Sequence, residues 1–184
     1  GATRFPFVHQ KNTLNSEIVM RDSQLESTDL TTWIGDGSSA NTNAKFTFTN
    51  VVCGGTPSVG LYFPATVGGG SRITIDGGAW RATTTVVQFS RALSDSTVTI
   101  KGGAVLTATT APAVFFRTNN IIATTTLLID GVTTSHPAGS VANALLFTSA
   151  VSDSAITVKQ THLGTITSSG VKFSSTVADT AVSL

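Results

Sequence analysis

The stretch from residue 73 to residue 89 reads ITIDGGAWRATTTVVQF and contains two short phrases of β-strand character. The first is Ile73-Thr74-Ile75, and the second, Val87-Gln88-Phe89, ends in an aromatic residue. Both alternate apolar and polar residues. This is the pattern of a strand with one buried face, because successive side chains point to opposite faces. The stretch therefore predicts two strands within one repeat.

Both phrases return along the chain at nearly constant intervals. The first phrase begins at Ile18, Phe46, Ile73, Val98, Leu127, Ile156 and Val182, so the intervals are 28, 27, 25, 29, 29 and 26 residues. The second phrase keeps step with the first and ends at Ile34, Phe63, Phe89, Phe116, Phe147 and Phe173. A near-constant period of this length, with turns of variable length, is typical of a stacked solenoid.

The repeats predict continuous columns of buried side chains. If each repeat is one coil of a parallel β-helix, equivalent residues lie about 4.8 Å apart along the stack. The two sets of residues above then form apolar inward columns, and a third column contains Val67, Leu93, Ile122, Val151 and Val177. We predict a single all-β domain, a right-handed, three-sided parallel β-helix (a β-solenoid) of about six coils. It covers residues 17–184 and follows an N-terminal arm or cap at residues 1–16.

Composition and charge agree with this fold and narrow the range of partners. Charged residues make up 11% of the chain, and Thr, Ser and Gly are abundant, so helix formers are few. The net charge is +1 and there is no basic run, which predicts no nucleic-acid partner. No apolar stretch reaches the roughly 18 residues that a membrane-spanning helix needs, so we expect no membrane insertion.

Residue types that bind metals or undergo redox chemistry are sparse. The single cysteine, Cys53, excludes an internal disulfide. Its expected column mates, which predict a small buried residue at this position, are Leu25, Trp80, Val105 and Leu163. His9, His136 and His162 share no ligand spacing with each other or with the cysteine. We therefore expect no metal site and no cofactor.

The strand phrases and three similar turns carry a resemblance to a known class. The turns are Ser94-Asp95-Ser96, Ser152-Asp153-Ser154 and Ala178-Asp179-Thr180. Over roughly residues 17–184, the chain resembles right-handed parallel β-helices, the architecture of pectin-lyase-like enzymes, phage tailspikes and many secreted adhesins. Its repeat composition is also similar to that of the Thr/Ser/Ala-rich repeats of large surface proteins. The resemblance implies an extracellular location, or one at a cell or virion surface.

Two aspartates lie at a separation that a catalytic pair would need. Asp76 and Asp130 are two coils apart, about 9.6 Å by the stacking repeat, which approaches the carboxylate separation of inverting glycosidases. Lys101 and Lys159 alternate with them in the same column, and an adjacent lysine favours an ionised acid over a proton donor. We therefore predict a surface charge ladder at these four positions.

Three further aspartates, Asp95, Asp153 and Asp179, each precede a strand within a turn. Asp153 and Asp179 are one coil apart, about 5 Å, which is near the spacing of a retaining glycosidase pair. However, an aspartate between small residues at such a position accepts hydrogen bonds from the backbone that follows it. We predict that these residues cap turns and that the protein has no catalytic residue.

One outward column of the second strand is unusually apolar. It reads Trp33, Tyr62, Gln88, Phe115, Leu146 and Lys172. Four large apolar groups in one strip exceed what a monomer usually leaves in water, so we predict a contact with another subunit or with sugar rings. The predicted contact residues are Trp33, Tyr62, Phe115 and Leu146. Alternatively, the apolar segment Arg4–Val8, which has no place in the repeat, folds over the strip.

The last phrase, Val182-Ser183-Leu184, begins a new coil in phase and predicts an open C-terminal face. Unpaired strand edges on such a face pair with other chains. Either further chain or another copy completes the stack, and for the second case we expect end-to-end self-association with the N-terminal arm reaching across the joint. The predicted contact residues are Phe5, Phe7, Val182 and Leu184.

These features favour a non-enzymatic extracellular β-solenoid, used as a structural or adhesive surface module or as a self-associating fibre subunit. The first alternative is a carbohydrate-active β-helix enzyme or a tailspike-like polysaccharide-binding protein. The second is an ice-binding solenoid, because a threonine ladder is formed by the outward column Thr47, Thr74, Thr99, Leu128 and Thr157. Ice-binding solenoids use two such ladders, whereas the neighbouring column here contains Lys45 and Arg72.

Overall fold

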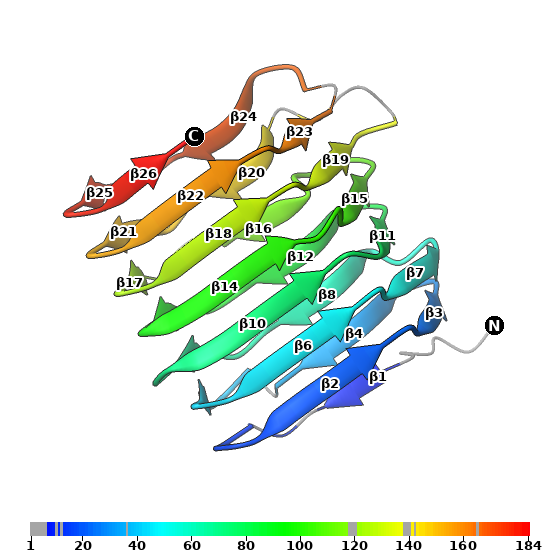
Figure 1. Ribbon diagram of the computed structural model, residues 1–184, viewed down its shortest axis with the longest axis horizontal. Coiled ribbons are helices and arrows are strands. Elements are labelled where there is room, and N and C mark those ends of the chain that lie inside the picture. Colours follow the sequence, from blue (N-terminus) through cyan, green and yellow to red (C-terminus); the bar gives the residue numbers. More distant parts are fainter. Residues whose placement is uncertain are drawn as a thin grey trace.

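The computed structural model describes residues 7–9, 11, 13–35, 37–117, 121–137, 141, 143–164 and 166–184. These residues form an all-β fold without helices, in which the strands pair in parallel and stack as a β-solenoid of about six turns (Figure 1). The predicted all-β parallel β-solenoid of about six coils is therefore confirmed, but the strands form four sheets where three walls were predicted. Right-handed winding is the expectation from the chirality of parallel crossovers.

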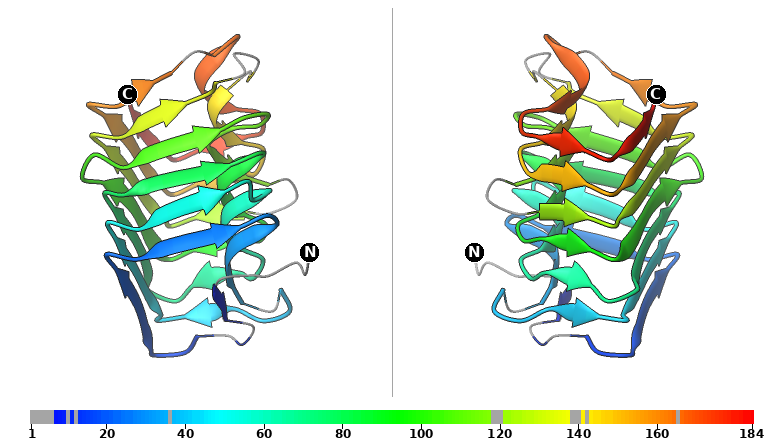
Figure 2. Two further views of the ribbon diagram at one scale, coloured as in Figure 1. Left: turned by 90° about the vertical axis from the view of Figure 1, so that its right-hand side faces the viewer. Right: turned by 90° about the vertical axis from the view of Figure 1, so that its left-hand side faces the viewer.

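The strands belong to four sheets, named here in the order in which one coil passes through them. Sheet I contains β2 (Glu17–Arg21), β6 (Lys45–Thr49), β10 (Ser71–Asp76), β14 (Ser96–Lys101), β18 (Thr126–Asp130), β22 (Ala155–Lys159) and β26 (Ala181–Ser183). Sheet II contains β3 (Gln24–Ser27), β7 (Val52–Gly55), β11 (Ala79–Ala82), β15 (Val105–Ala108), β19 (Thr133–Ser135) and β23 (His162–Leu163). Sheet III contains β1 (Phe7–His9), β4 (Leu30–Ile34), β8 (Val59–Phe63), β12 (Thr85–Phe89), β16 (Val114–Phe116), β20 (Asn143–Phe147) and β24 (Ser169–Phe173). Sheet IV contains β5 (Asn41–Thr42), β9 (Val67–Gly68), β13 (Leu93–Ser94), β17 (Ile121–Ala123), β21 (Ala150–Ser152) and β25 (Val177–Ala178). Figure 2 shows these layers from two sides.

The predicted aromatic column is confirmed on sheet III. The rings of Phe63, Phe89, Phe116, Phe147 and Phe173 follow one another at centroid distances of 5.1, 5.0, 4.5 and 4.6 Å, with successive planes within 15° of parallel. The first four rings are buried, and Phe173 is partly buried against the core. Parallel stacking arises because equivalent residues of neighbouring coils share a register and therefore a rotamer.

The other two predicted columns are also confirmed by strand register. In sheet I, Ile73 pairs with Phe46 on one side and with Val98 on the other. In sheet IV, Leu93 pairs with Val67 and with Ile122. Sheet II adds a fourth column to these three, and its inward residues are Leu25, Cys53, Trp80, Leu106, Thr134 and Leu163.

One member of the column around Cys53 was wrongly predicted. Val105 pairs with Ala79 and is partly exposed, whereas Leu106 pairs with Trp80 and is buried. The reason is one extra residue in the preceding turn. Residues 102–104 separate the paired strands there, whereas residues 77–78 suffice in the coil before. A shift of one residue exchanges the two faces of a strand.

The N-terminal segment also differs from expectation. Phe7 and Val8 do have a place in the repeat, because β1 pairs in parallel with β4, with Phe7 opposite Thr32 and Val8 opposite Trp33. The Phe7 side chain packs against the core, partly buried. Residues 4–6, which include Phe5, lie outside the described residues. Sheet III therefore begins before residue 17.

Two corners of each coil use left-handed backbone. Between sheets IV and I, positive φ angles occur at Asn15, Asn43, Gly70, Asp95, Thr124, Asp153 and Asp179. Between sheets I and II, they occur at Asp22, Asn50, Gly77, Gly102, Gly131 and Gln160. Asn, Asp and Gly tolerate this conformation better than other residues. The three aspartates lie in turns, as predicted, but none of the hydrogen bonds of the described residues ends on their carboxylates. The left-handed backbone, which the sequence reasoning missed, is the physical reason for aspartate at these positions.

Candidate functional site

The predicted contact strip forms one continuous file on the outer side of sheet III. Strand register aligns its members in the order Val8, Trp33, Tyr62, Gln88, Phe115, Leu146 and Lys172. Trp33, Tyr62, Phe115 and Leu146 are partly exposed. Val8 extends the file by one position, with its side chain exposed beside Trp33. For Val8, the alternative that the N-terminal segment covers the strip is therefore wrong.

Contacts within the strip hold its side chains in place. The rings of Trp33 and Tyr62 meet edge to face at a centroid distance of 5.5 Å. The Trp33 indole N–H donates to the carbonyl oxygen of Gly35, and the Gln88 amide donates to Ser90 Oγ at 3.0 Å. The strip is thus an ordered row of aromatic and aliphatic groups with one amide in it. Such a row can stack against sugar rings or pack against an apolar surface.

The predicted charge ladder is confirmed for two ion pairs. Lys101 Nζ lies 3.3 Å from Asp76 Oδ2, and Lys159 Nζ lies 3.2 Å from Asp130 Oδ2. All four side chains are partly exposed to solvent. Asp76 and Asp130, which have the separation of an inverting glycosidase pair, are therefore each paired with a lysine on a regular strand. Asp153 and Asp179, the other spaced pair, are exposed corner residues.

The histidines lie on different faces of the strands. His136 is buried, and its Nδ1 lies 3.1 Å from the carbonyl oxygen of Ala108 in the coil below. His162 is exposed and lies opposite Thr133 in the neighbouring strand. His136 is buried like Thr134, which lies two residues before it and therefore on the same face. Both histidines line a hollow of about 390 Å³. Within the described ranges, no three His, Cys, Asp or Glu side chains gather into a cluster that could hold a metal ion.

Cys53 occupies a core position, as predicted. Its side chain is buried in sheet II between Leu25 and Trp80. Burial raises the pKa of the thiol from its ordinary value of 9.0 to about 12, and a hydrogen bond with Thr31 opposes part of this rise. A protonated, buried thiol is a poor nucleophile. The geometry therefore gives Cys53 a packing role.

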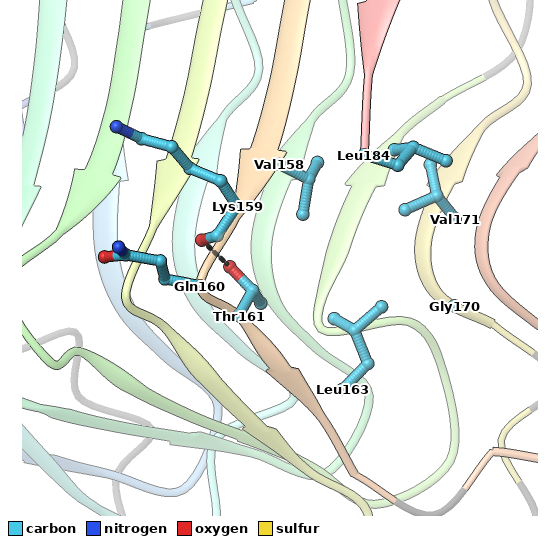
Figure 3. A pocket seen from close by; sticks show the side chains of 8 residues that line it. All are labelled: Val158, Lys159, Gln160, Thr161, Leu163, Gly170, Val171 and Leu184. Carbon is cyan, nitrogen blue, oxygen red and sulfur yellow. Dashed lines mark hydrogen bonds between the residues drawn. The ribbon is translucent and has the colours of Figure 1, made fainter.

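The C-terminal coil contains a hollow that sequence reasoning missed. It has a volume of about 410 Å³ and is lined by Val158, Lys159, Gln160, Thr161, Leu163, Gly170, Val171 and Leu184 (Figure 3). Thr161 Oγ1 donates to the Lys159 carbonyl oxygen at 2.8 Å, beside the hollow. The lining comes from β22, β23 and β24, from Gln160 and Thr161 between β22 and β23, and from Leu184 after β26.

The predicted end contacts lie at opposite ends of the stack. Val182 and Leu184 are 41% and 77% exposed on the C-terminal coil, whereas Phe7 belongs to the first strand of sheet III. Phe5 lies outside the described residues. The structure therefore does not bring Phe7 together with Val182 and Leu184 within one chain. They could meet only across a joint between two copies.

The threonine ladder has the arrangement that the sequence predicts. Strand register aligns Thr47, Thr74, Thr99, Leu128 and Thr157 on the outer side of sheet I. The adjacent outward file contains Glu17, Lys45 and Arg72, and the Lys45 ammonium pairs with Glu17 at 2.8 Å. A charged pair interrupts the second file, so the two files differ in chemistry.

Comparison with known proteins gave no relative: no family model, curated protein or solved structure matches the chain. Among the described residues, no helix has the length and apolar character to cross a bilayer. The functional reasoning therefore rests on the surfaces described above.

Proposed function

We propose that the protein is a non-enzymatic structural or adhesive β-solenoid of an extracellular, cell-surface or virion-surface assembly. One observation carries this proposal: Asp76 and Asp130, the acids with the spacing of an inverting pair, are each ion-paired with a lysine in a regular surface file. A glycosidase needs one carboxylic acid that donates a proton and a second carboxylate that acts on the sugar or on water. A neighbouring ammonium favours the charged form of an acid and so opposes the proton-donor role.

The fold supports a load-bearing role on physical grounds. The backbone hydrogen bonds of a β-solenoid run along its long axis, and each coil is held by its neighbours on both sides. In this chain, four parallel sheets and the stacked phenylalanine column follow that axis. Such a rod suits a spacer or a fibre subunit. Its abundant surface threonines and serines also offer hydroxyl groups for O-glycans.

The proposal is tested by activity on a panel of acidic and neutral polysaccharides. We expect no turnover from the wild-type chain, with reducing ends and unsaturated products as the readouts. The matched variant Asp130→Asn removes one carboxylate of the ladder and keeps the size of the side chain. If the wild-type chain turns over a polysaccharide and Asp130→Asn does not, the proposal is overturned and the charge ladder is identified as an active site.

We propose adhesion through the contact strip as a second role, because its partly exposed rings are held in fixed positions. Aromatic side chains bury large areas and stack on flat apolar faces, as sugar rings provide. Binding to a glycan array is the direct test. Phe115→Ser should abolish any such binding, whereas Thr99→Ser, on the outer side of sheet I, should preserve it. Equal loss in the two variants, or glycan binding that survives Phe115→Ser, would contradict the role of the strip.

A further inference from the structure

Sheet III carries basic residues on its outer side and in the turns that leave it. Lys172 lies in the contact strip on β24, and Arg91 and Arg117 follow β12 and β16. Within the described part of the chain, the strands of sheet III contain no acidic residue. The turns between sheets III and IV contain one acid, Asp36, which lies outside the described residues. Positive charge therefore predominates beside the contact strip.

Strand register places Arg91 close to the strip. The backbone N–H of Ser90 donates to the Phe63 carbonyl oxygen at 3.0 Å, so the register continues past the end of β12. Arg91 comes next and is exposed. Since a strand rises about 3.3 Å per residue, the Cα atom of Arg91 lies within about 10 Å of that of Gln88 in the strip. The long side chain of Arg91 can therefore reach a molecule that is bound to the strip.

Arg91 also lines a hollow at the corner between sheets III and IV. The hollow has a volume of about 180 Å³, and its lining contains Gly37, Ser38, Ser39, Ala40, Thr66 and Arg91. One wall is a long turn, because residues 35–40 separate β4 from β5, whereas residues 64–66 suffice between β8 and β9. This turn lies against the next coil, since a Cβ atom at Gly37 would be 3.6 Å from the Cβ atom of Pro64.

The groups in the hollow suit an anion. The guanidinium of Arg91 is a rigid fork of N–H donors that matches the oxygen atoms of a carboxylate or a similar oxyanion. The hydroxyl groups of Ser38 and Ser39, whose oxygens are 3.5 Å apart, and that of Thr66 can donate as well. The hollow is smaller than the roughly 300 Å³ of a typical small-molecule pocket. It therefore suits one charged substituent of a ligand that lies mostly outside it.

The long turn connects the hollow to the aromatic rings of the strip. The Trp33 indole N–H donates to the carbonyl oxygen of Gly35, the first residue of this turn, and the Trp33 ring contacts Tyr62 edge to face. Trp33 and Arg91 belong to the first and third coils, so they are about 9.6 Å apart along the stack. One short oligosaccharide can therefore contact both the rings and the hollow.

We propose that the contact strip binds an acidic glycan, whose sugar rings lie on Trp33 and Tyr62 while a carboxylate or sulfate group enters the hollow beside Arg91. The proposal deepens the adhesive role above, on which it rests, by naming the class of glycan. Arg91 distinguishes an acidic glycan from a neutral one, because only the former supplies an anion for the guanidinium. The rings distinguish a glycan from an acidic peptide, since acidic side chains offer no flat apolar face on which to stack.

The first test compares four polymers by isothermal titration calorimetry. Heparin carries sulfate groups, polygalacturonate carries carboxylates, dextran is neutral, and polyglutamate is an anionic chain without sugars. At least one of the two acidic glycans should bind the wild-type chain at least about tenfold more tightly than dextran and polyglutamate, because hydrogen bonds to charged groups contribute most. Tighter binding of heparin assigns the hollow to sulfate, and tighter binding of polygalacturonate assigns it to carboxylate.

The second test changes the hollow and uses a matched control. Arg91→Gln should weaken binding of the acidic glycan at least about tenfold. Arg72→Gln removes the same charge from an exposed arginine on the outer side of sheet I and should leave the affinity unchanged. Thr66→Val removes a hydroxyl group but no charge, and should weaken binding about two- to tenfold. Circular dichroism should show the same fold in all three variants.

The results separate this proposal from the adhesive role. Dextran binding as tight as that of the acidic glycans, and unaffected by Arg91→Gln, would overturn the acidic ligand and leave the adhesive role intact. Equal losses in Arg91→Gln and Arg72→Gln, or tight binding of polyglutamate, would show attraction by charge alone and would also overturn it. Unchanged binding in Thr66→Val would place the anion outside the hollow and overturn the site. If no glycan binds the wild-type chain, the adhesive role is itself contradicted, and the acidic ligand with it.

Discussion

Replacing Phe116 with alanine should remove the centre of the aromatic column and cost about 3 to 5 kcal/mol of unfolding free energy. The ring is 2% exposed and stacks on Phe89 at 5.0 Å and on Phe147 at 4.5 Å. Each stacked pair contributes about 0.5 to 1.5 kcal/mol beyond the area it buries. The remainder of the loss is the transfer of the ring and the cavity that the neighbouring coils cannot close.

Phe173→Ala is the matched control, because the same ring type stacks on one neighbour only, Phe147 at 4.6 Å, and is partly buried. It should cost less than half as much. Equilibrium urea unfolding followed by circular dichroism measures both, and a second probe should give the same transition, since repeat stacks can unfold in parts. For a chain of this length, the Phe116→Ala loss corresponds to roughly 6 to 20 °C in Tm. Losses of equal size in the two variants would refute the continuous column.

Three further variants and conditions test separate features. Asp130→Asn should change the unfolding free energy by about 1 kcal/mol or less in urea titrations, because exposed ion pairs contribute little. Gly78→Ala should destabilise more than Gly103→Ala in the same assay: both glycines have positive φ, but a Cβ at residue 78 would lie 2.2 Å from the Val51 carbonyl oxygen, whereas one at residue 103 meets no atom within 4 Å. Cys53 should resist iodoacetamide at pH 8 until urea unfolds the chain. Because its folded pKa is raised from 9.0 to about 12, the folded state keeps the proton longer, so this contribution to stability is complete below about pH 9 and is lost as the pH rises towards 12.

Most of the fold could be predicted because several signals in each coil agree. Alternation identifies the strands, and the repeat aligns them, so that Phe89 is matched with Phe63 and Phe116 without knowledge of the turns. Turn lengths are less predictable. The turn before Leu106 holds one residue more than its equivalents, and only the hydrogen-bonding register shows that Leu106 replaces Val105 in the core.

The ends of the stack were harder to predict for a physical reason. Three residues, Phe7–His9, are too few to show a period, and His9 stands where later coils have isoleucine or phenylalanine. Pairing with β4 is what makes this segment a strand, so tertiary contact decides its structure. The hollow at the C-terminal coil was missed because its lining comes from three strands and from Leu184, residues that the repeat pattern assigns to separate columns. The pattern predicts which residues share a column, but not the space left between columns.

The contact strip was predictable because outward and inward residues alternate along a strand. The sequence alone could place Trp33 and Tyr62 in one file, but not the edge-to-face contact at 5.5 Å that fixes their rings. Likewise, it could place Asp130 near a lysine, whereas the pairing with Lys159 rather than Lys101 depends on side-chain geometry. Register follows from the pattern, and local geometry follows from rotamers.

The first and last coils of the core differ in polarity. The first coil carries buried polar residues at inward positions: Thr32 shares a column with Val171, and Asn41 shares one with Val177. Asn41 Oδ1 accepts the backbone N–H of Thr13 at 2.9 Å, so one of these polar groups is satisfied within the coil. Among the described residues, Thr32 Oγ1 and Asn41 Nδ2 are buried without a hydrogen-bond partner, and a buried polar group without a partner costs about 1 to 3 kcal/mol. The later coils have aliphatic residues at these positions, so these two columns carry no such cost there. The apolar columns therefore stabilise the later coils more than the first.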